Sequence, residues 1–320
     1  MTKSAFLKAN VIHPFNGRDC ASFEEDKIRF EDGKDLEVLN GIPVLIDESK
    51  SIFRVDDILK SAPITQDSGY RNNSLKNRVR KSILPQLSKD FSFEKRYKQL
   101  AESVRGQKVL VIGAGAKIKE YNELFSDALV ITSDVHLQFS PDIVFDAHQI
   151  PFKDETFDLI IAGQVLEHTF RPWEVAKEMQ RCVKHNGLLL VEIPFNFPYH
   201  SPPYDFFRFT FTGLRSLFPI CELKRYEVSE GQGSAVAVFN SQFLVDLFSN
   251  RYLRMVMVFI SRFLFGWIKY LDVFRKRTTY RRIYAPMGFS MLFKKDGRQR
   301  KDDELLEAYY SLKNKQKEKA

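Results

Sequence analysis

Cysteine is scarce in this 320-residue sequence, with Cys20, Cys182 and Cys221 far apart and no CxxC pair. Neither a disulfide framework nor a cysteine zinc site is supported, and we expect no bound metal. Long apolar runs are also lacking. No uncharged stretch in the most apolar region approaches the ~18 residues that a membrane-spanning helix needs, and residues 1–14 lack the apolar core of a signal peptide. These absences predict a reduced, cytoplasmic protein.

Acidic residues are nearly absent from one segment. The chain has 49 Lys and Arg against 41 Asp and Glu, a formal charge of +8. Residues 251–282 contain nine of these cations and one acid, Asp272, so the rest of the chain is balanced. Because binding along a nucleic acid needs a broader basic surface and a recognisable binding motif, no nucleic acid is expected as a partner. A shorter run, residues 71–81, has five cations and no acid.

Strand and helix patterns alternate over residues 106–225, which is typical of a parallel α/β sheet. The pattern divides the chain into four parts. We predict a small β module over 1–50, a polar helical linker over 51–105, an α/β domain over 106–298 with a helical insertion at 240–282, and a charged tail over 299–320.

A glycine turn follows the first strand of the α/β domain. The apolar run Val109–Ile112 predicts a buried strand and leads into Gly113-Ala114-Gly115,. Glycines there let the backbone approach a ligand at the start of the next helix. The next strand ends at Asp134, where a carboxylate can accept hydrogen bonds from the hydroxyls of a ribose. The structural alternatives are packing glycines and a turn-capping aspartate. A dinucleotide site would want a third glycine where Ile118 stands.

Further segments follow in a fixed order, and they carry a family resemblance. They are Asp142–Ala147, Ile150-Pro151-Phe152, Thr156–Ile161, Val165–His168 and Asn186–Pro194. This order, continuous from about Val109 to Ile193, closely resembles the class I S-adenosylmethionine-dependent methyltransferases, in particular the branch that methylates small molecules, lipids and sugars. The resemblance implies a doubly wound, mostly parallel α/β sheet, S-adenosylmethionine as cofactor, and methyl transfer as the activity.

The resemblance also implies a set of cofactor-binding residues. Two glycines flank the methionine end of the cofactor, and a strand-end aspartate holds the ribose. A second aspartate and the alanine after it recognise the adenine, while a glycine and a glutamine lie beneath the amino-acid moiety. In that order these are Gly113 and Gly115, Asp134, Asp146 and Ala147, and Gly163 and Gln164.

Two positions depart from the family pattern. Val111 stands where the family has an acid that helps orient the cofactor's ammonium group, and Lys117 replaces a third glycine. Both changes could weaken cofactor binding. A catalytically silent, cofactor-binding scaffold is therefore kept as an alternative function.

An aromatic, proline-rich tract over residues 194–210 follows the fifth strand, whose carboxyl end borders the ligand crevice in an open α/β sheet. It resembles the HxxPxDxxRxT segment of methyltransferases from surface-polysaccharide gene clusters. His200, Pro203, Asp205, Arg208 and Thr210 fill that pattern. Tyr199, His200, Asp205 and Arg208 are the candidate substrate-binding residues. A structural ion pair between Asp205 and Arg208 is the alternative.

Methyl transfer is an in-line displacement, so the enzyme mainly aligns a nucleophile about 3 Å from the methyl carbon. A hydroxyl acceptor also needs a base, and histidine suits that role near neutral pH. The candidate catalytic residues are His200 first, His168 second and Asp205 third. We expect His136 and His148 to be exposed and without such a role.

The acceptor that these features favour is a hydroxyl of a sugar or lipid-linked glycan, in a polysaccharide pathway near a membrane. A lipophilic small molecule such as a quinone is the second candidate, and RNA a weaker one. The substrate class rests on family analogy, because a fold does not specify a substrate.

The N-terminal segment carries a second resemblance. Asn40–Ile46 is similar to the closing strand of a small zinc-ribbon-like activator module that occurs alone or fused ahead of methyltransferases. The metal cysteines of that family are missing apart from Cys20, with His13 nearby. Because two residues cannot supply four tetrahedral ligands, we expect a degenerate module that packs as a small β unit without zinc.

Residues 251–276 predict an amphipathic helix that lies on a membrane surface. At 100° per residue the charged residues fall within a stripe about 80° wide, and apolar residues fill the remaining arc. The predicted partner of residues 251–282 is an anionic membrane surface. The protein's own core and a homodimer partner are the alternatives.

Overall fold

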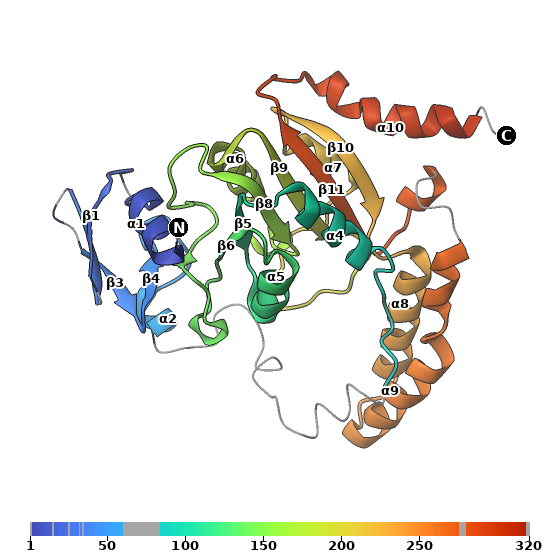
Figure 1. Ribbon diagram of the computed structural model, residues 1–320. Helices are drawn as coiled ribbons and strands as arrows, with labels where there is room; N and C mark the ends of the chain where they lie inside the picture. Colours follow the sequence, from blue (N-terminus) through green and yellow to red (C-terminus); the bar gives the residue numbers. More distant parts are fainter. Residues whose placement is uncertain are drawn as a thin grey trace.

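The computed structural model describes residues 2–59 apart from positions 15, 25, 32 and 34, residues 84–274, and residues 280–317. The basic run 71–81 lies outside these described residues. A six-stranded sheet with the order β10-β11-β9-β8-β5-β6 occupies the centre of the molecule (Figure 1). Its strands are β5 Lys108–Ile112, β6 Leu129–Thr132, β8 Phe157–Gly163, β9 Val183–Pro194, β10 Cys221–Val228 and β11 Gly288–Lys295.

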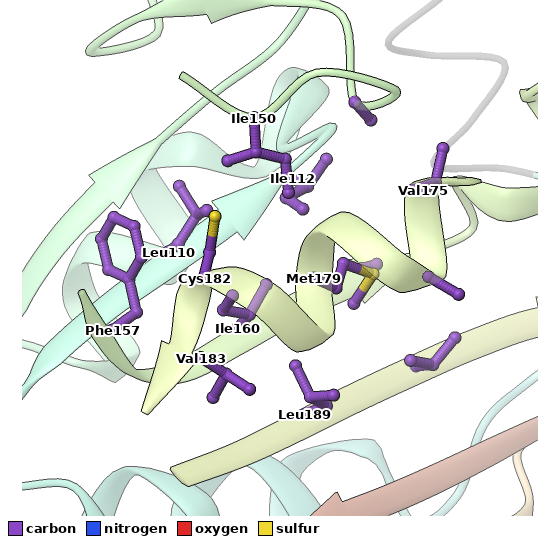
Figure 2. Close-up of a cluster of buried hydrophobic side chains, with 14 of the residues drawn as sticks. Leu110, Ile112, Ile150, Phe157, Ile160, Val175, Met179, Cys182, Val183 and Leu189 are labelled. Atoms are coloured by element: carbon purple, nitrogen blue, oxygen red, sulfur yellow. The ribbon is translucent and has the colours of Figure 1, made fainter. Parts of the chain in front are cut away.

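Strands β6, β5, β8 and β9 are parallel, and β11 is antiparallel to both of its neighbours. Helices cover both faces, as the alternation of side chains along β5 shows. Leu110 and Ile112 join the core cluster that includes α6 (Figure 2), whereas Val109 and Val111 join the cluster under α4 and α5. The covering helices are α4 Phe93–Ser103, α5 Ile118–Leu124, α6 Pro172–Cys182 and α7 Phe211–Ser216. The predicted fold class, doubly wound and mostly parallel, is confirmed.

The N-terminal strands extend the sheet system rather than standing apart. They are β1 Cys20–Phe23, β2 Lys27–Phe30, β3 Asp35–Leu39 and β4 Ile42–Leu45, followed by α2 Val55–Leu59. Strand β4 pairs in parallel with β7, Val144–Phe145, and Ile143 forms a parallel bridge to Ser133 just after β6. The first 50 residues therefore pack on the strand whose end carries Asp146.

One element of this segment differs from the prediction, which had strands alone over residues 1–50. Helix α1, Lys3–Asn10, is capped by the Thr2 hydroxyl, which accepts from the backbone N–H of Ala5. Its Phe6 is fully buried and packs on Phe157, with 5.6 Å between ring centroids. This tertiary contact stabilises a helix whose own sequence has only a weak amphipathic pattern.

The C-terminal third of the chain consists mainly of helices that precede and follow strand β11 in the sequence. Helix α8 spans Gln232–Asp246, α9 spans Arg251–Phe265, and 3-10 turns follow as η5 Ile268–Phe274 and η6 Tyr280–Ile283. The predicted continuous helix over 251–276 is wrong, because α9 ends at Gly266. After that glycine, Lys269 bonds the Gln86 carbonyl and Asp272 caps α8 at the N–H groups of Gly233 and Ser234, which draws the chain into a tighter turn. The charged tail forms α10, Asp302–Lys317, with Leu305 and Leu312 buried.

Candidate active site

A glycine turn lies at the carboxyl end of β5. Gly113 and Gly115 have φ values of 62° and 52°, which L side chains rarely adopt,. A Cβ atom on Gly113 would lie 2.6 Å from the Cγ2 atom of Val165. Position 113 therefore accommodates only glycine while Val165 stays in place, and the turn keeps the backbone exposed to the neighbouring pockets.

The first pocket beside this turn has a volume of about 100 Å³ and lies at the ends of β6 and β7. It is lined by four of the predicted cofactor residues together with Phe53 of the linker. Those four are Gly113, Asp134, Asp146 and Ala147, and Gln164 lines the pocket as a fifth predicted cofactor residue. The structure thus brings together the residues assigned to the adenosine half of the cofactor.

The two aspartates of this pocket are each held by a histidine two positions later. Oδ1 of Asp134 lies 2.8 Å from Nδ1 of His136, and Oδ2 accepts the N–H of Gly115 at 2.8 Å. Oδ1 of Asp146 lies 2.6 Å from Nδ1 of His148. The expectation that these histidines are exposed is wrong, because each folds back as the side-chain partner of its own aspartate.

Asp146 has a further partner that the sequence did not suggest. Ser51, in the linker, donates its hydroxyl to Oδ2 at 2.5 Å. Burial opposes ionisation of this carboxyl, but the hydrogen bonds from His148 and Ser51 lower the pKa of Asp146 below its usual value,. The carboxylate that would recognise the adenine is therefore charged and fixed in orientation.

The second pocket, of about 440 Å³, lies on the other side of the glycine turn. Gly113, Gln164 and His168 line both pockets, so the two pockets adjoin at these residues. Of the two pockets, Gly115, Gly163 and His200 line only the second. The backbone of Gln164 has a φ of 60°. All seven predicted cofactor residues line one pocket or the other, and two predicted catalytic histidines line the second.

An acidic network at the floor of the second pocket was missed by sequence reasoning. Buried Arg96 of α4 lies 2.5 Å from both Asp90 and Glu192 and 3.4 Å from Glu227. Burial opposes the charge of this guanidinium, but the carboxylates raise its pKa,. Tyr97 donates its hydroxyl to Glu192 at 3.0 Å. Asp90, just before α4, and Glu192 of β9 therefore line the same pocket as the glycine turn, where Val111 leaves the family's usual acid missing.

The two candidate catalytic histidines come from different segments and meet in this pocket. His168 belongs to the turn η4, Leu166–His168, and His200 to the loop after β9. Their ring centroids are 4.8 Å apart. Nδ1 of His168 lies 2.6 Å from the Tyr204 carbonyl oxygen, so Nδ1 carries the proton and Nε2 is the acceptor,. Burial lowers the pKa of both imidazoles. Each is therefore neutral near pH 7.

Asp205 and Arg208 form the ion pair that was the structural alternative. Both Asp205 oxygens accept from Arg208, at 2.6 and 2.7 Å, and Oδ2 also accepts the N–H of His200 at 2.8 Å. Burial opposes ionisation of Asp205, but the Arg208 hydrogen bonds outweigh it and lower its pKa. Neither side chain lines the pocket. Tyr199, another candidate substrate-binding residue, is 65% exposed. The pair anchors the loop that presents His200.

Glu167 is a residue of the same turn that sequence reasoning passed over as the neighbour of His168. Its side chain is fully buried, and neither carboxylate oxygen has a hydrogen-bond partner. Oε1 lies 3.8 Å from Nε2 of His168. Burial raises the pKa of Glu167 to about 8. The Glu-His pair in Val165–His168 was the available signal, because buried acids beside histidines cluster at functional sites.

The chain was compared with known families and structures. A family model described as a methyltransferase domain matches residues 113–191. No curated protein matches the sequence. Similar solved structures include a chain from the Haloferax volcanii complex with the Trm112 methyltransferase activator (14% identity, TM-score 0.42, covering 67% of this chain and 92% of that one). An S-adenosylmethionine-dependent methyltransferase from Archaeoglobus fulgidus has 17% identity and a TM-score of 0.41, covering 63% of this chain and 93% of that one.

The family match and the site agree in position. Residues 113–191 run from the glycine turn to a point near the end of β9, and they include Asp134, Asp146 and the Glu167-His168 turn. S-adenosylmethionine is the cofactor that this domain uses. Residues 113–191 thus belong to a methyltransferase domain, and the sheet that contains them has the class I fold.

Proposed function

We propose that this methyltransferase acts on a hydroxyl of a sugar or lipid-linked glycan at the surface of a membrane. The observation that carries the proposal is the pair of neutral imidazoles, His168 and His200, in the pocket beside the glycine turn. A methyl acceptor with a hydroxyl needs such a group to assist loss of its proton, whereas the sulfonium itself needs only alignment.

The loop that presents His200 supports the choice of acceptor. Its His, Asp and Arg match the pattern of methyltransferases from polysaccharide gene clusters. The Asp205–Arg208 pair holds His200 at the rim of a pocket large enough for a monosaccharide beside the cofactor,. His200 is the first candidate to activate the hydroxyl, and His168 is the second.

The test is transfer of a labelled methyl group from S-adenosylmethionine to extracted lipid-linked glycans, with a lipophilic quinone as a parallel acceptor. Label in a base-stable methyl ether of the sugar supports the proposal. Label that appears in the quinone alone would replace the glycan by the second candidate acceptor.

The proposed domain organisation remains that of the sequence: 1–50, 51–105, 106–298 and 299–320. We propose that residues 1–50 are a degenerate activator module. Pairing of β4 with β7 supports this idea, because it holds the strand whose end carries Asp146.

The membrane part of the proposal depends on α9 and η5, which lie beside α8 at one end of the molecule (Figure 1). No helix within the described residues is long and apolar enough to cross a bilayer. The polar groups of this segment face the protein: Ser261 bonds Ser241 at 2.6 Å, and Arg262 donates to the Pro85 carbonyl at 2.9 Å. Its aromatic residues face outward, with Phe263 and Phe274 83% and 85% exposed.

A helix that packs on the protein core normally turns its apolar side chains inward, whereas α9 and η5 turn theirs outward. The exposed arc comprises Tyr252, Leu253, Met255, Val256, Phe259, Ile260, Phe263, Leu264, Trp267, Tyr270, Leu271, Val273 and Phe274. Among the alternatives, the protein's own core, as far as the described residues form it, leaves this arc exposed. The net charge of +8 over residues 251–282 favours an anionic surface at the cytoplasmic face of a membrane over a second copy of the same basic segment,.

We expect the protein to co-sediment with vesicles of phosphatidylcholine containing about one quarter phosphatidylserine, and to be released as salt rises. Phe263→Glu and Phe274→Glu should each weaken binding by about tenfold or more, because each removes an aromatic ring from the bilayer interface. Tyr310→Glu on α10 is the control, since Tyr310 is also exposed but lies on another element.

If the intact protein ignores these vesicles at low salt, the membrane proposal fails. Self-association at the same concentrations, abolished by the two α9–η5 substitutions, would then assign the surface to a homodimer.

A further inference from the structure

Three side chains that can bind a metal ion lie together beside the second pocket, which His168 and His200 line. Ligand atoms of Glu167, His168 and His200 all lie within 4.8 Å of one another. The first two come from the η4 turn and the third from the 194–210 loop. Two backbone hydrogen bonds tie these segments together, because the N–H groups of Phe206 and Phe207 donate to the Glu167 carbonyl at 2.8 and 3.2 Å.

Among the residues that the structure describes, the Glu167 carboxylate has no hydrogen-bond partner. Both oxygens are buried without a hydrogen bond. Arg208 is already bonded to both oxygens of Asp205 and to the carbonyl groups of Phe197, Pro198 and Phe207. Ionising a buried carboxyl group that has no partner costs several kcal/mol. A cation bound at the oxygens would remove this cost.

The two histidines present acceptor nitrogens to the same place. Nδ1 of His168 is fixed by the Tyr204 carbonyl, which leaves the Nε2 lone pair on the side of Glu167. Metal-binding histidines are commonly oriented by such a backbone carbonyl. Nδ1 of His200 lies 3.2 Å from Asp205, 3.3 Å from the Pro198 carbonyl oxygen and 3.3 Å from an Arg208 nitrogen. With the Nδ1 proton directed to the two oxygens, Nε2 is the atom left for a ligand.

We propose that Glu167, His168 and His200 form a binding site for a divalent first-row transition cation, of the Zn²⁺ or Mn²⁺ type, with its remaining coordination positions open to the pocket. Imidazole ligands favour these ions over Mg²⁺, which prefers oxygen. Ligand atoms around tetrahedral Zn²⁺ lie about 3.4 Å apart. A shift of up to about 1.4 Å closes the site, and His200 can supply it because its loop side chain is 30% exposed,.

This inference rests on the proposed function and deepens it. An acceptor hydroxyl at an open position would lose its proton more readily, because coordination lowers the pKa of bound oxygen. The proton goes to water in the pocket, the oxygen forms the new C–O bond, and the S–CH₃ bond breaks to leave S-adenosylhomocysteine. His168 and His200 then activate the hydroxyl as ligands of the cation.

The test uses the full chain after treatment with a chelator. Titration with Co²⁺, followed by visible absorption, and with Zn²⁺, followed by calorimetry, should show one site per chain. Glu167→Gln and His200→Ala should each weaken binding by about 100-fold or more. His185→Ala is the matched control, since this exposed histidine lies at the start of β9.

The two substitutions probe folding differently. Glu167→Gln keeps the shape of a buried side chain, whereas His200→Ala changes a partly exposed loop position. If both variants lose cation binding while their unfolding temperatures stay unchanged, the result supports the metal site. Absence of Co²⁺ and Zn²⁺ binding in the wild-type chain overturns it, as does equal binding by all variants. S-adenosylmethionine affinity is measured in the same samples. If the cofactor binds and the cation does not, the metal site fails and the proposed methyl transfer stands, with imidazole as the base.

Discussion

Replacing His200 by alanine is expected to slow methyl transfer by about 10²–10⁴-fold while leaving S-adenosylmethionine affinity nearly unchanged. The imidazole lines the pocket beside the glycine turn, 4.8 Å from that of His168 between ring centroids. It makes no contact with Asp134 or Asp146, which are assigned to the cofactor. The loss should therefore fall on the chemical step, whether His200 acts as a base or as a ligand of a cation.

The Asp205–Arg208 pair makes this substitution interpretable. Arg208 bonds three backbone carbonyl groups of the loop as well as Asp205, so the loop keeps its main anchors when the His200 side chain is removed. Single-turnover kinetics with saturating cofactor measure the effect, and His185→Ala serves as the control. An unchanged rate would transfer the role to His168. Loss of the folded state would show that His200 is structural.

The parts of the site that could be predicted depend on short-range sequence order. Gly113, Gly115 and Asp134 follow from a strand, a tight turn and the end of the next parallel strand, and this order alone brings them together. His200 could be predicted for the same reason, because it follows the fifth strand. The Asp205–Arg208 contact needed only a spacing of three residues.

The missed parts depend on contacts between distant segments. The Glu192–Arg96 pair joins residues 96 positions apart, and Ser51 reaches Asp146 over 95 positions. The burial of Glu167 is set by the loop that folds over its turn. Helix α9 shows the same limit, because its end at Gly266 is fixed by Lys269 and Asp272 reaching Gln86 and α8. Periodicity predicts the arc of apolar residues, but tertiary contacts decide where the helix stops.

The apolar side chains of α9 face outward, which favours an external partner over the protein's own core as the surface that this helix contacts. Periodicity predicts one charged stripe and one apolar arc, and it does not say which of them faces the protein. Here Ser261, Lys269 and Asp272 are buried while Phe263 and Trp267 are exposed. The structure thereby supplies the orientation that composition alone could not give.

Asp134→Ala is expected to weaken S-adenosylmethionine binding by about 1.5–3 kcal/mol, the usual loss for hydrogen bonds to a charged group. That corresponds to about 10–150-fold in Kd. Asp134 has two tasks in this site. It faces the first pocket, where the ribose hydroxyls would donate to it, and its Oδ2 accepts the N–H of Gly115 at 2.8 Å, which fixes the glycine turn.

Two companion variants separate these tasks. Asp134→Asn keeps one oxygen for the Gly115 N–H but removes the charge, so it should lose less affinity than Asp134→Ala. Asp142→Ala is the matched control: Asp142 accepts from Thr132 and Lys3 near the same strand end but does not line the pocket, so it can destabilise the fold without changing cofactor affinity. Calorimetry on the folded fraction of each variant gives the comparison. If wild type and Asp134→Ala bind the cofactor equally, the carboxylate does not hold the ribose and serves the turn alone.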